Sequence, residues 1–449
     1  MLVGLLAGGL IASGATTVGA RPHKPHKPPK VTLTARVAPT AVPVGDPATL
    51  TIRLRPAARG VRLVVQRRAG SRWVTLARPR TDAQGTARLR LGTSAAGEQR
   101  LRVLRKSAQR SRRAVSRPVT LTVVASAPGC TPRAALVDPQ AAAAARCLAA
   151  RLDRWQAAGA MGVGQQLNVS NNAYLSPLAA LGGRPVKVVG FDLKELGEGE
   201  TYQFPDPPLE RLVALAQAGA VLSASWHPAN PHTGGYYGDR GWHDLGALLD
   251  ESTPEYAQFW ADYAGRLELL RRFQDAGVAV VFRPLHEANG DWFWWGHPDP
   301  ATYRRVWALM QQKTWAAGVH NVLWAYSFNA VTGANTGDPV RLLPSKVDLA
   351  GLDSYDEEAS NPGDQLSVGG YDAVAAKVKR MAITEAGPHN SYDGSWDPGV
   401  ITRTARTLST PPLWSMLWFD DGTGKKQIGS LQRGPAWLDS CRGGFCSLG

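Results

Sequence analysis

The fold is decided by the stretch Val278-Ala-Val-Val-Phe-Arg-Pro-Leu-His-Glu287, an apolar run that ends abruptly in polar side chains. Its first five residues are apolar at odd and even positions alike, which is typical of a strand buried on both faces of a parallel sheet. Segments with helical periodicity lie on either side of it, at Pro254–Gly277 and Pro300–Gly318. Both end in glycine, a common signal for the end of a helix. The stretch therefore predicts one β-α unit of a repeated pattern.

The same rhythm recurs throughout the chain after residue 150, where a further helical segment covers Leu209–Gly219. Eight apolar runs are predicted to be strands: Met161–Gln166, Val186–Leu193, Ala220–Pro228, Val278–Glu287, Asn321–Asn329, Val347–Tyr355, Arg380–Gly387 and Leu413–Asp420. Eight β-α units in about 300 residues are typical of a (β/α)8 TIM barrel. A doubly wound dinucleotide-binding fold is the alternative, but no run is followed by Gly-x-Gly-x-x-Gly.

The region before the barrel has a different pattern, since residues 31–125 alternate apolar and polar side chains in about seven short stretches. Period two indicates half-buried strands, and so many in so few residues favour a small all-β sandwich, immunoglobulin-like or fibronectin-like. The 449-residue chain is therefore expected to be multidomain. We expect a signal peptide at 1–20, a Pro/Lys-rich linker at 21–30, the sandwich at 31–125, a linker at 126–135 and the barrel at 136–449.

The net charge of +15 is concentrated in one region. Residues 21–130 hold 24 Lys and Arg against three acids, whereas residues 131–449 hold 27 basic and 33 acidic residues. The basicity therefore belongs to the sandwich and its linker, and it does not make the whole chain a nucleic-acid-binding protein. Two interpretations stay open for the basic domain: a solvated spacer, or a surface that adheres to an anionic cell-wall polymer.

The beginning of the chain is typical of a secretory signal peptide, because the apolar run Leu2–Ile11 is followed by small residues ending in Val18-Gly-Ala20. We expect a secreted, extracellular protein, and association with a cell wall is a further interpretation. No apolar run approaches the ~20 residues that a membrane-spanning helix needs, which argues against an integral membrane protein. The four cysteines suggest two disulfides. We favour Cys130–Cys147 with Cys441–Cys446, and pairing between the two ends of the barrel domain is the alternative.

Two carboxylates define the candidate chemistry, because Glu287 and Glu385 end the fourth and seventh runs. In a TIM barrel the loops after the strands build the active site, so these side chains are expected to face each other. Such a pair suits glycoside hydrolysis, in which one carboxyl protonates the leaving oxygen and the other attacks the anomeric carbon. An ion pair of Glu287 with Arg283 is disfavoured, since the two lie ~13 Å apart along a straight strand. A metal site at His286, His297 and Glu287 is disfavoured because no His-Glu-x-x-His helix is present.

Aromatic residues crowd the same predicted loops, and flat sugar faces stack on aromatic rings. They are Trp226, Trp242, Trp292, Trp294, Trp295, Tyr355 and Trp418. Because Trp294 and Trp295 are adjacent and must point differently, at most one is expected to reach the substrate.

The segment from Arg283 to Gly296, Arg-Pro-Leu-His-Glu-Ala-Asn-Gly-Asp-Trp-Phe-Trp-Trp-Gly, closely resembles the acid/base segment of glycoside hydrolase family 26. The resemblance covers roughly residues 155–440. It includes the segments Trp226–Pro231, Val347–Tyr355 and Thr384–Gly387. It implies a retaining barrel enzyme, most often an endo-β-1,4-mannanase.

The resemblance also implies roles for single residues. Glu287 would be the acid/base and Glu385 the nucleophile. Arg283 and Tyr355 would flank the nucleophile, His286 would contact the substrate near the cleavage point, and Trp418 would form the floor beneath the sugar. His227, Trp292 and Trp295 complete the set of expected substrate-binding residues.

We therefore expect a secreted, monomeric enzyme that hydrolyses β-1,4-mannosidic linkages in mannan, galactomannan or glucomannan by double displacement, without a metal or other cofactor and without nucleic acid as a partner. A β-glucanase or β-1,3-xylanase of the same family is one alternative. A polysaccharide-binding surface protein that does not cut its ligand is another. The sugar preference, endo or exo action and the role of the basic domain stay open at this point.

Overall fold

The computed structural model describes residues 31–38, 40–43, 48–92, 97–106, 113–124, 135–168, 176–196, 208–356 and 366–448. The expected signal peptide, the linker at 21–30 and Cys130 lie outside the described residues. Among the helices within these ranges, none combines the length and apolar character that crossing a membrane requires.

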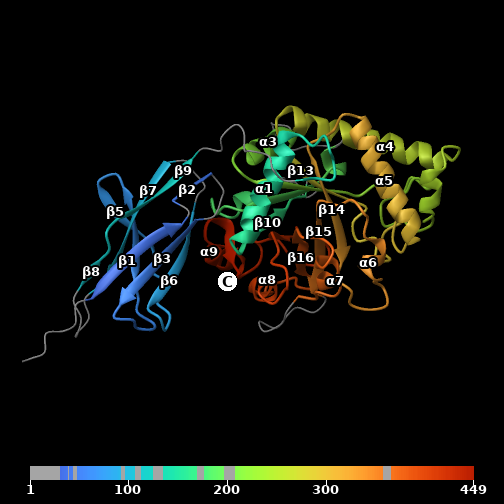
Figure 1. Cartoon of the computed structure of the whole chain (residues 1–449). Coiled ribbons are helices and arrows are strands. Elements are labelled where there is room, and N and C mark those ends of the chain that lie inside the picture. Colours follow the sequence, from blue (N-terminus) through green and yellow to red (C-terminus); the bar gives the residue numbers. More distant parts are fainter. Residues whose placement is uncertain are drawn as a thin grey trace, which may run out of the picture.

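In the described parts of the amino-terminal region the regular elements are all strands (Figure 1). Its strands are β1 (Thr32–Ala38), β2 (Ala41–Pro43), β3 (Ala48–Arg55), β4 (Val64–Ala69), β5 (Arg72–Ala77), β6 (Thr86–Leu91), β7 (Gly97–Arg105), β8 (Ala114–Val115) and β9 (Val119–Val124). They form one sheet of order β1-β3-β6 and a second of order β2-β9-β7-β4-β5, with β8 paired to β7. The all-β architecture is confirmed, and its Ig-like character stays a prediction.

The core of the sandwich follows from the period-two pattern. Alternate residues such as Leu50, Ile52 and Leu54 of β3 point inward and are buried against Leu101 and Leu121 of the other sheet. The intervening positions of β3 are Thr or Arg and face outward. One apolar face per sheet is therefore enough to hold this small domain together.

The second region is a closed barrel of eight parallel strands. They are β10 (Ala160–Gln166), β11 (Val188–Asp192), β12 (Val221–Trp226), β13 (Val280–Pro284), β14 (Val322–Asn329), β15 (Leu349–Asp356), β16 (Met381–Pro388) and β17 (Trp414–Leu417). Strand β10 pairs with both β11 and β17, which closes the ring. Each strand overlaps its predicted run and differs from it by at most three residues at either end. The predicted TIM barrel is confirmed.

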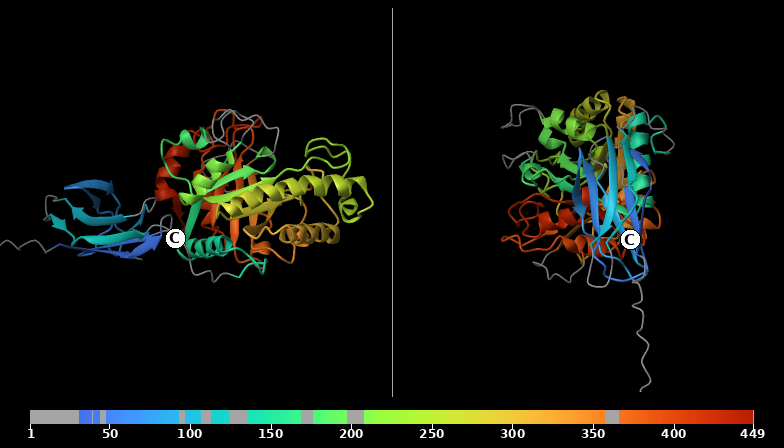
Figure 2. Two further views of the ribbon diagram at one scale, coloured as in Figure 1. Left: turned by 90° about the horizontal axis from the view of Figure 1, so that it is seen from above. Right: turned by 90° about the vertical axis from the view of Figure 1, so that its left-hand side faces the viewer.

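Helices surround the barrel (Figures 1 and 2). The α-helices are α1 (Ala143–Ala157), α2 (Ser176–Ala179), α3 (Pro208–Gln217), α4 (Pro254–Asp275), α5 (Pro300–Ala316), α6 (Pro339–Leu342), α7 (Tyr371–Ala375), α8 (Gly399–Ala405) and α9 (Gly434–Ser440). Short 3₁₀ turns are η1 (Lys194–Leu196), η2 (Leu245–Leu249) and η3 (Arg442–Gly444), and a final strand is β18 (Phe445–Ser447).

Capping residues fix the first and last turns of the long helices. In α4 the Thr253 hydroxyl accepts a hydrogen bond from the Tyr256 amide, and Pro254 occupies the first helical turn, where no amide donor is needed. Gly277 follows this helix with φ +71°, a left-handed conformation that glycine adopts without steric cost. Gly318 ends α5 in the same way, with φ +74°.

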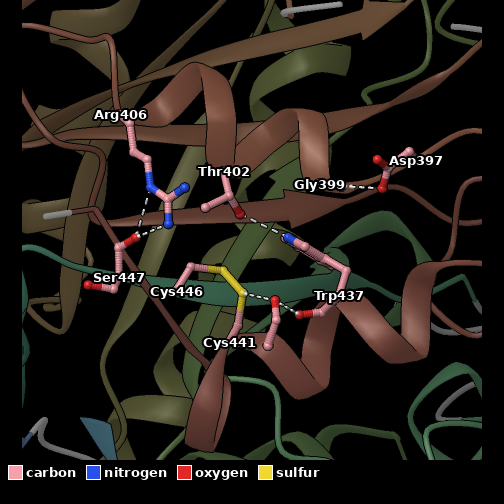
Figure 3. The surroundings of a disulfide bond; sticks show 9 residues. Asp397, Gly399, Thr402, Arg406, Trp437, Cys441, Cys446 and Ser447 are labelled. Carbon is pink, nitrogen blue, oxygen red and sulfur yellow. Dashed lines mark hydrogen bonds between the residues drawn. A yellow bond between two sulfur atoms is a disulfide. The ribbon is translucent and has the colours of Figure 1, made fainter. Parts of the chain in front are cut away.

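A disulfide between Cys441 and Cys446, confirming the predicted pairing, joins the end of α9 to β18 (Figure 3). Trp437 of α9 donates its indole hydrogen to the hydroxyl of Thr402 in α8 at 2.9 Å, which holds this segment against the barrel. Cys147 in α1 is also disulfide-bonded, while its predicted partner Cys130 lies outside the described residues.

The sandwich touches the barrel at the amino-terminal end of β10 (Figure 1). Arg90 of β6 donates hydrogen bonds to the carbonyl oxygens of Ala158 and Gly159 at 2.5 and 2.7 Å, just before β10 begins. Gly443 of η3 packs against Gly92 at the end of β6. Since the active sites of TIM barrels lie at the carboxyl ends of the strands, these contacts hold the sandwich at the opposite end of the barrel.

Replacement by alanine should have opposite effects on stability at Gly265, within α4, and at Gly277, just after its end. Gly277→Ala should lower the free energy of unfolding by about 1 kcal/mol, because alanine is strained at φ +71° although its Cβ would meet no other atom. Gly265→Ala, in the exposed middle of α4, should raise it by about 0.5–1 kcal/mol by favouring helix. Urea unfolding followed by Trp fluorescence measures both changes. A change of the same sign in the two variants would contradict this account of the helix end.

Candidate active site

The acidic pair lies at the carboxyl ends of the barrel strands. Strand β13 stops at Pro284, and the chain then turns through left-handed φ angles of 45° at Leu285 and 53° at Glu287. The Glu287 amide donates to the Ser327 carbonyl of β14 at 2.9 Å, which anchors this turn. Non-glycine residues adopt such angles at a cost of order 1 kcal/mol each, and they cluster at functional sites.

Glu385 is positioned by an irregularity in strand pairing. Leu352 of β15 lies opposite Ile383, but the next residue, Asp353, lies opposite Glu385, so Thr384 is an extra residue in β16. Such a β-bulge redirects the side chains around it. One carboxylate oxygen each from Glu287, Asp353 and Glu385 lies within 4.8 Å of the other two. The two predicted carboxylates therefore meet in space.

Arg283 organises the cluster and is fully buried. Its Nη2 donates to Glu385 Oε1 at 2.8 Å, and its Nη1 lies 3.5 Å from Asp353 Oδ2. It does not form the ion pair with Glu287 considered above, because its guanidinium is directed to Glu385 of β16 and Asp353 of β15. The other oxygen of Glu385 accepts a 2.7 Å hydrogen bond from the Tyr355 hydroxyl. Burial and the charge of Glu385 raise the pKa of Tyr355 well above its usual value, so this hydroxyl stays a donor.

Glu287 has a different environment. Its Oε2 accepts from Trp292 Nε1 at 2.7 Å and its Oε1 accepts from Asn329 Nδ2 at 2.9 Å. Burial first, and the charge of Glu385 second, raise the pKa of Glu287 from 4.5 to about 7, although both hydrogen bonds oppose this shift. Below about pH 7 Glu287 therefore holds a proton, while Arg283 and Tyr355 donate hydrogen bonds to Glu385.

His286, the residue before Glu287, lies beside Glu385 and His227. It is almost completely buried, and its Nε2 is 4.0 Å from Glu385 Oε1. Burial lowers its pKa well below the usual value, with the charges of His227 and Arg283 adding to the effect, so the imidazole is neutral. Its ring stands edge-on to that of His227, with centroids 4.5 Å apart.

The remaining predicted residues divide into two groups. Trp292, Tyr355 and Trp418 are partly exposed, and Trp418 is joined to β16 by a hydrogen bond from its amide to the Ala386 carbonyl at 3.0 Å. Trp295 is fully buried, as is Trp294, so neither ring is available to a sugar. The expected substrate contact of Trp295 is replaced by a supporting one, since its Nε1 donates to the His286 carbonyl at 2.8 Å.

Besides Asp353, two residues of the site escaped the sequence analysis. Asp192, at the end of β11, binds His227 Nδ1 through a 2.5 Å contact with its Oδ2. Burial alone would raise the pKa of Asp192, but the charge and hydrogen bond of His227, with hydrogen bonds from the Lys194 amide and the Ser225 hydroxyl, outweigh burial and lower the pKa. Asn329, at the end of β14, holds Glu287. Both could have been found by asking which polar residue ends every predicted strand.

The carboxylate cluster also has the spacing of a metal site, but its surroundings favour acid–base chemistry. Arg283 already pairs with two of the three carboxylates, which supplies the positive charge that a cation would bring. His297, considered above as a ligand, instead has its Nε2 2.8 Å from the Asn289 carbonyl.

A closed (β/α)8 barrel with a protonated and a hydrogen-bonded carboxyl group facing each other at its strand ends is the arrangement of a glycoside hydrolase. The family description "Glycosyl hydrolase family 26" matches residues 205–433, just over half of the chain. The chain belongs to this family.

Curated relatives are similar over part of their length. Mannan endo-1,4-beta-mannosidase of Bacillus subtilis strain 168 is 29% identical over 223 residues, which cover 47% of this chain and 59% of that protein. The enzyme of the same name from Bifidobacterium adolescentis is 28% identical over 293 residues, covering 57% of this chain and 29% of the relative. The chain thus spans about three-fifths of the length of the Bacillus relative.

Solved structures share the fold. The YdhT protein from Bacillus subtilis superposes with a TM-score of 0.56 at 24% identity, covering 68% of this chain and 92% of that one. A modular endo-beta-1,4-mannanase from Cellulomonas fimi gives 0.54 at 23% identity, covering 69% and 76% of the two chains. These likenesses extend over the barrel and support the architecture.

The coupling of the two glutamates is directly measurable. Glu385→Gln removes a neighbouring negative charge at nearly constant shape, so the pKa of Glu287 should fall below about 7 while staying above 4.5, because burial remains. Carboxyl ¹³C NMR of Glu-labelled protein follows the titration. Glu255→Gln, which changes a glutamate bound to His232, is the control and should leave the pKa of Glu287 unchanged. An unchanged value in the Glu385 variant would refute the coupling.

Proposed function

We propose that the chain is a secreted, retaining endo-glycosidase that hydrolyses β-1,4-mannosidic linkages in mannan, galactomannan or glucomannan. The observation that carries the proposal is the approach of the Glu287 and Glu385 carboxylate oxygens to within 4.8 Å. Retaining enzymes need carboxyl groups ~5–5.5 Å apart, whereas inverting enzymes hold them ~6.5–9.5 Å apart to admit a water molecule.

Glu287 and Glu385 take different roles because their electrostatic environments differ. Glu287 carries a proton below about pH 7 and would deliver it to the glycosidic oxygen as the bond breaks. Glu385, with both oxygens hydrogen-bonded by Arg283 and Tyr355, is held in position to attack the anomeric carbon. The glycosidic C–O bond breaks, the leaving sugar takes the proton, and an ester forms between Glu385 and the sugar.

The second step follows from the same coupling. Once Glu385 is esterified its negative charge is gone, so one of the two causes of the raised pKa of Glu287 disappears. Glu287, which lost its proton in the first step, then serves as the base that takes a proton from water. The water oxygen bonds to the anomeric carbon, the ester breaks, and the configuration of the sugar is retained.

The choice of mannan rests on the relatives, several of which are named mannan endo-1,4-beta-mannosidase. Secretion is supported by the signal-like first 20 residues and by the disulfides, which persist in oxidising compartments.

Replacing Glu385 by Ala should reduce hydrolysis of galactomannan by several orders of magnitude with the fold retained, because the attacking group is lost. Reducing-end release measures the activity and circular dichroism checks the fold. Glu268→Ala, an exposed glutamate of α4, is the control and should keep full activity. Near-native hydrolysis by the Glu385 variant would overturn the assignment of the nucleophile.

A panel of substrates tests the sugar assigned. Galactomannan and glucomannan should release oligosaccharides of mixed length, as expected when an endo-acting enzyme cuts internal bonds. Preferential cleavage of mixed-linkage β-glucan or β-1,3-xylan would replace the mannan assignment by another activity of the family. Binding without release of any reducing end would contradict the enzymatic proposal itself.

The pH profile should have a basic limb near 7. Because the pKa of Glu287 is about 7 in the folded protein, raising the pH through this value removes the proton that the leaving oxygen needs, and kcat/KM should fall. Trp292→Phe deletes a hydrogen bond that favours the ionised form, so the limb should move to higher pH. A limb that stays in place, or moves to lower pH, would show that Glu287 does not control it.

A further inference from the structure

One face of the sandwich combines positive charge and hydroxyl groups in a regular pattern. We call it the Arg–Thr face, and define it by six outward-pointing residues of β1, β3 and β6: Thr34, Arg36, Thr51, Arg53, Thr86 and Arg88. Their neighbours along each strand, such as Val37, Ile52 and Leu89, point inward and form the core.

The strand register arranges these residues in two cross-strand rows. Arg36 lies opposite Thr51, which lies opposite Arg88. In the adjacent row Thr34 lies opposite Arg53, which lies opposite Thr86. Every arginine therefore has threonine as its direct cross-strand neighbour, and the guanidinium groups are spread over the face with hydroxyls between them.

The charge of this face is unbalanced. Arg36, Arg53 and Arg88 are exposed, and within the described residues none of them has a hydrogen bond or ion pair. Arg90, on the same strand as Arg88, is instead engaged by the barrel. Of the acidic residues that the structure describes in the sandwich, Asp82 lies just before β6 and accepts hydrogen bonds from the amides of Gln84 and Thr86, and Glu98 lies on the other sheet.

The surface between the strands offers room for a ligand. A shallow hollow is lined by Thr34, Ala35, Arg36, Ala38, Thr51 and Arg53. Arg36 and Arg88 stand two strands apart, about 10 Å by the usual strand spacing. A linear polymer lying across the strands would thus meet guanidinium and hydroxyl groups alternately.

The chemistry of the face matches that of an acidic polysaccharide. Planar guanidinium groups bind carboxylates through paired, charge-assisted hydrogen bonds, and threonine hydroxyls both donate to and accept from sugar hydroxyls. A polyuronate presents these two groups in alternation along its length. Single-stranded nucleic acid would in addition require aromatic rings on which its bases can stack, but Trp73, the single aromatic residue of 31–124, lies on the other sheet beneath Arg102.

We propose that the Arg–Thr face binds a linear polyuronate, and that it anchors the chain to an acidic polysaccharide while the far end of the barrel stays free to bind its own substrate. The contacts of Arg90 and η3 with the barrel leave the face exposed and hold the sandwich away from the strand ends that carry Glu287. Only the use of this anchor, to concentrate the chain beside neutral β-mannan, rests on the function proposed above.

The test compares two triple variants of the full chain with equal loss of charge. R36Q/R53Q/R88Q removes the three free guanidinium groups of the face, whereas R67Q/R72Q/R100Q removes three exposed arginines of the other sheet. Binding to polygalacturonate is measured by titration calorimetry at low and high salt. The face variant should bind about tenfold more weakly or worse, the control variant should stay close to wild type, and wild-type binding should weaken as salt rises.

The outcomes separate this proposal from the enzymatic one. Both variants should hydrolyse soluble galactomannan at the wild-type rate, because none of the six arginines lies near the active site, and both should give wild-type circular dichroism. Equal loss of binding in the two variants would mean that net charge alone acts, and would overturn the proposal. It would equally be overturned by salt-insensitive binding, or by tighter binding of the wild type to a poly(glycerol phosphate) or to duplex DNA than to polygalacturonate.

Discussion

The ion pair between Arg283 and Glu385 is the interaction on which the active site depends. A fully buried guanidinium is tolerable only when it is paired, and here its charge is shared between Glu385 and Asp353. The cation pairs with these two carboxylates rather than with Glu287, which is buried beside Glu385, so that burial and the charge of Glu385 raise the pKa of Glu287 to about 7. One buried cation therefore creates two chemically different carboxyl groups from two identical side chains.

The barrel supplies the geometry for this division. Parallel strands deliver Arg283, Asp353 and Glu385 to the same end of the molecule from three different strands. Among the eight described barrel strands the register shifts only at β16, around the extra residue Thr384, and the chain makes a left-handed turn at Glu287. A rigid framework held by many buried side chains can sustain such local strain, which would be lost in a flexible loop.

Most of the barrel was predictable from the sequence, because parallel strands buried on both faces leave long apolar runs, and glycines such as Gly277 and Gly318 mark helix ends. Glu287 and Glu385 were predictable because they end such runs. Asp192 and Asn329 were not singled out, since their roles depend on the neighbours that folding brings to them.

Trp295 was expected from the sequence to bind the substrate, but the structure gives it another role. Its position in an aromatic loop suggested contact with a sugar, but side-chain direction within a turn depends on backbone angles that sequence does not reveal, and the ring is buried beneath His286. The short strands β2 and β8 escaped the sequence analysis for a related reason, because two or three residues are too few to show a period.

The stereochemistry of the first product tests the central claim most directly, because it depends on the separation of the two carboxyl groups rather than on their identity. Proton NMR can follow the anomers released from a β-1,4-linked manno-oligosaccharide before they equilibrate. Carboxylates as close as those of Glu287 and Glu385 leave no room for a water molecule between the second group and the sugar, so the β-anomer should be released first. Initial release of the α-anomer would show that water attacks directly, and would contradict the arrangement described for this site.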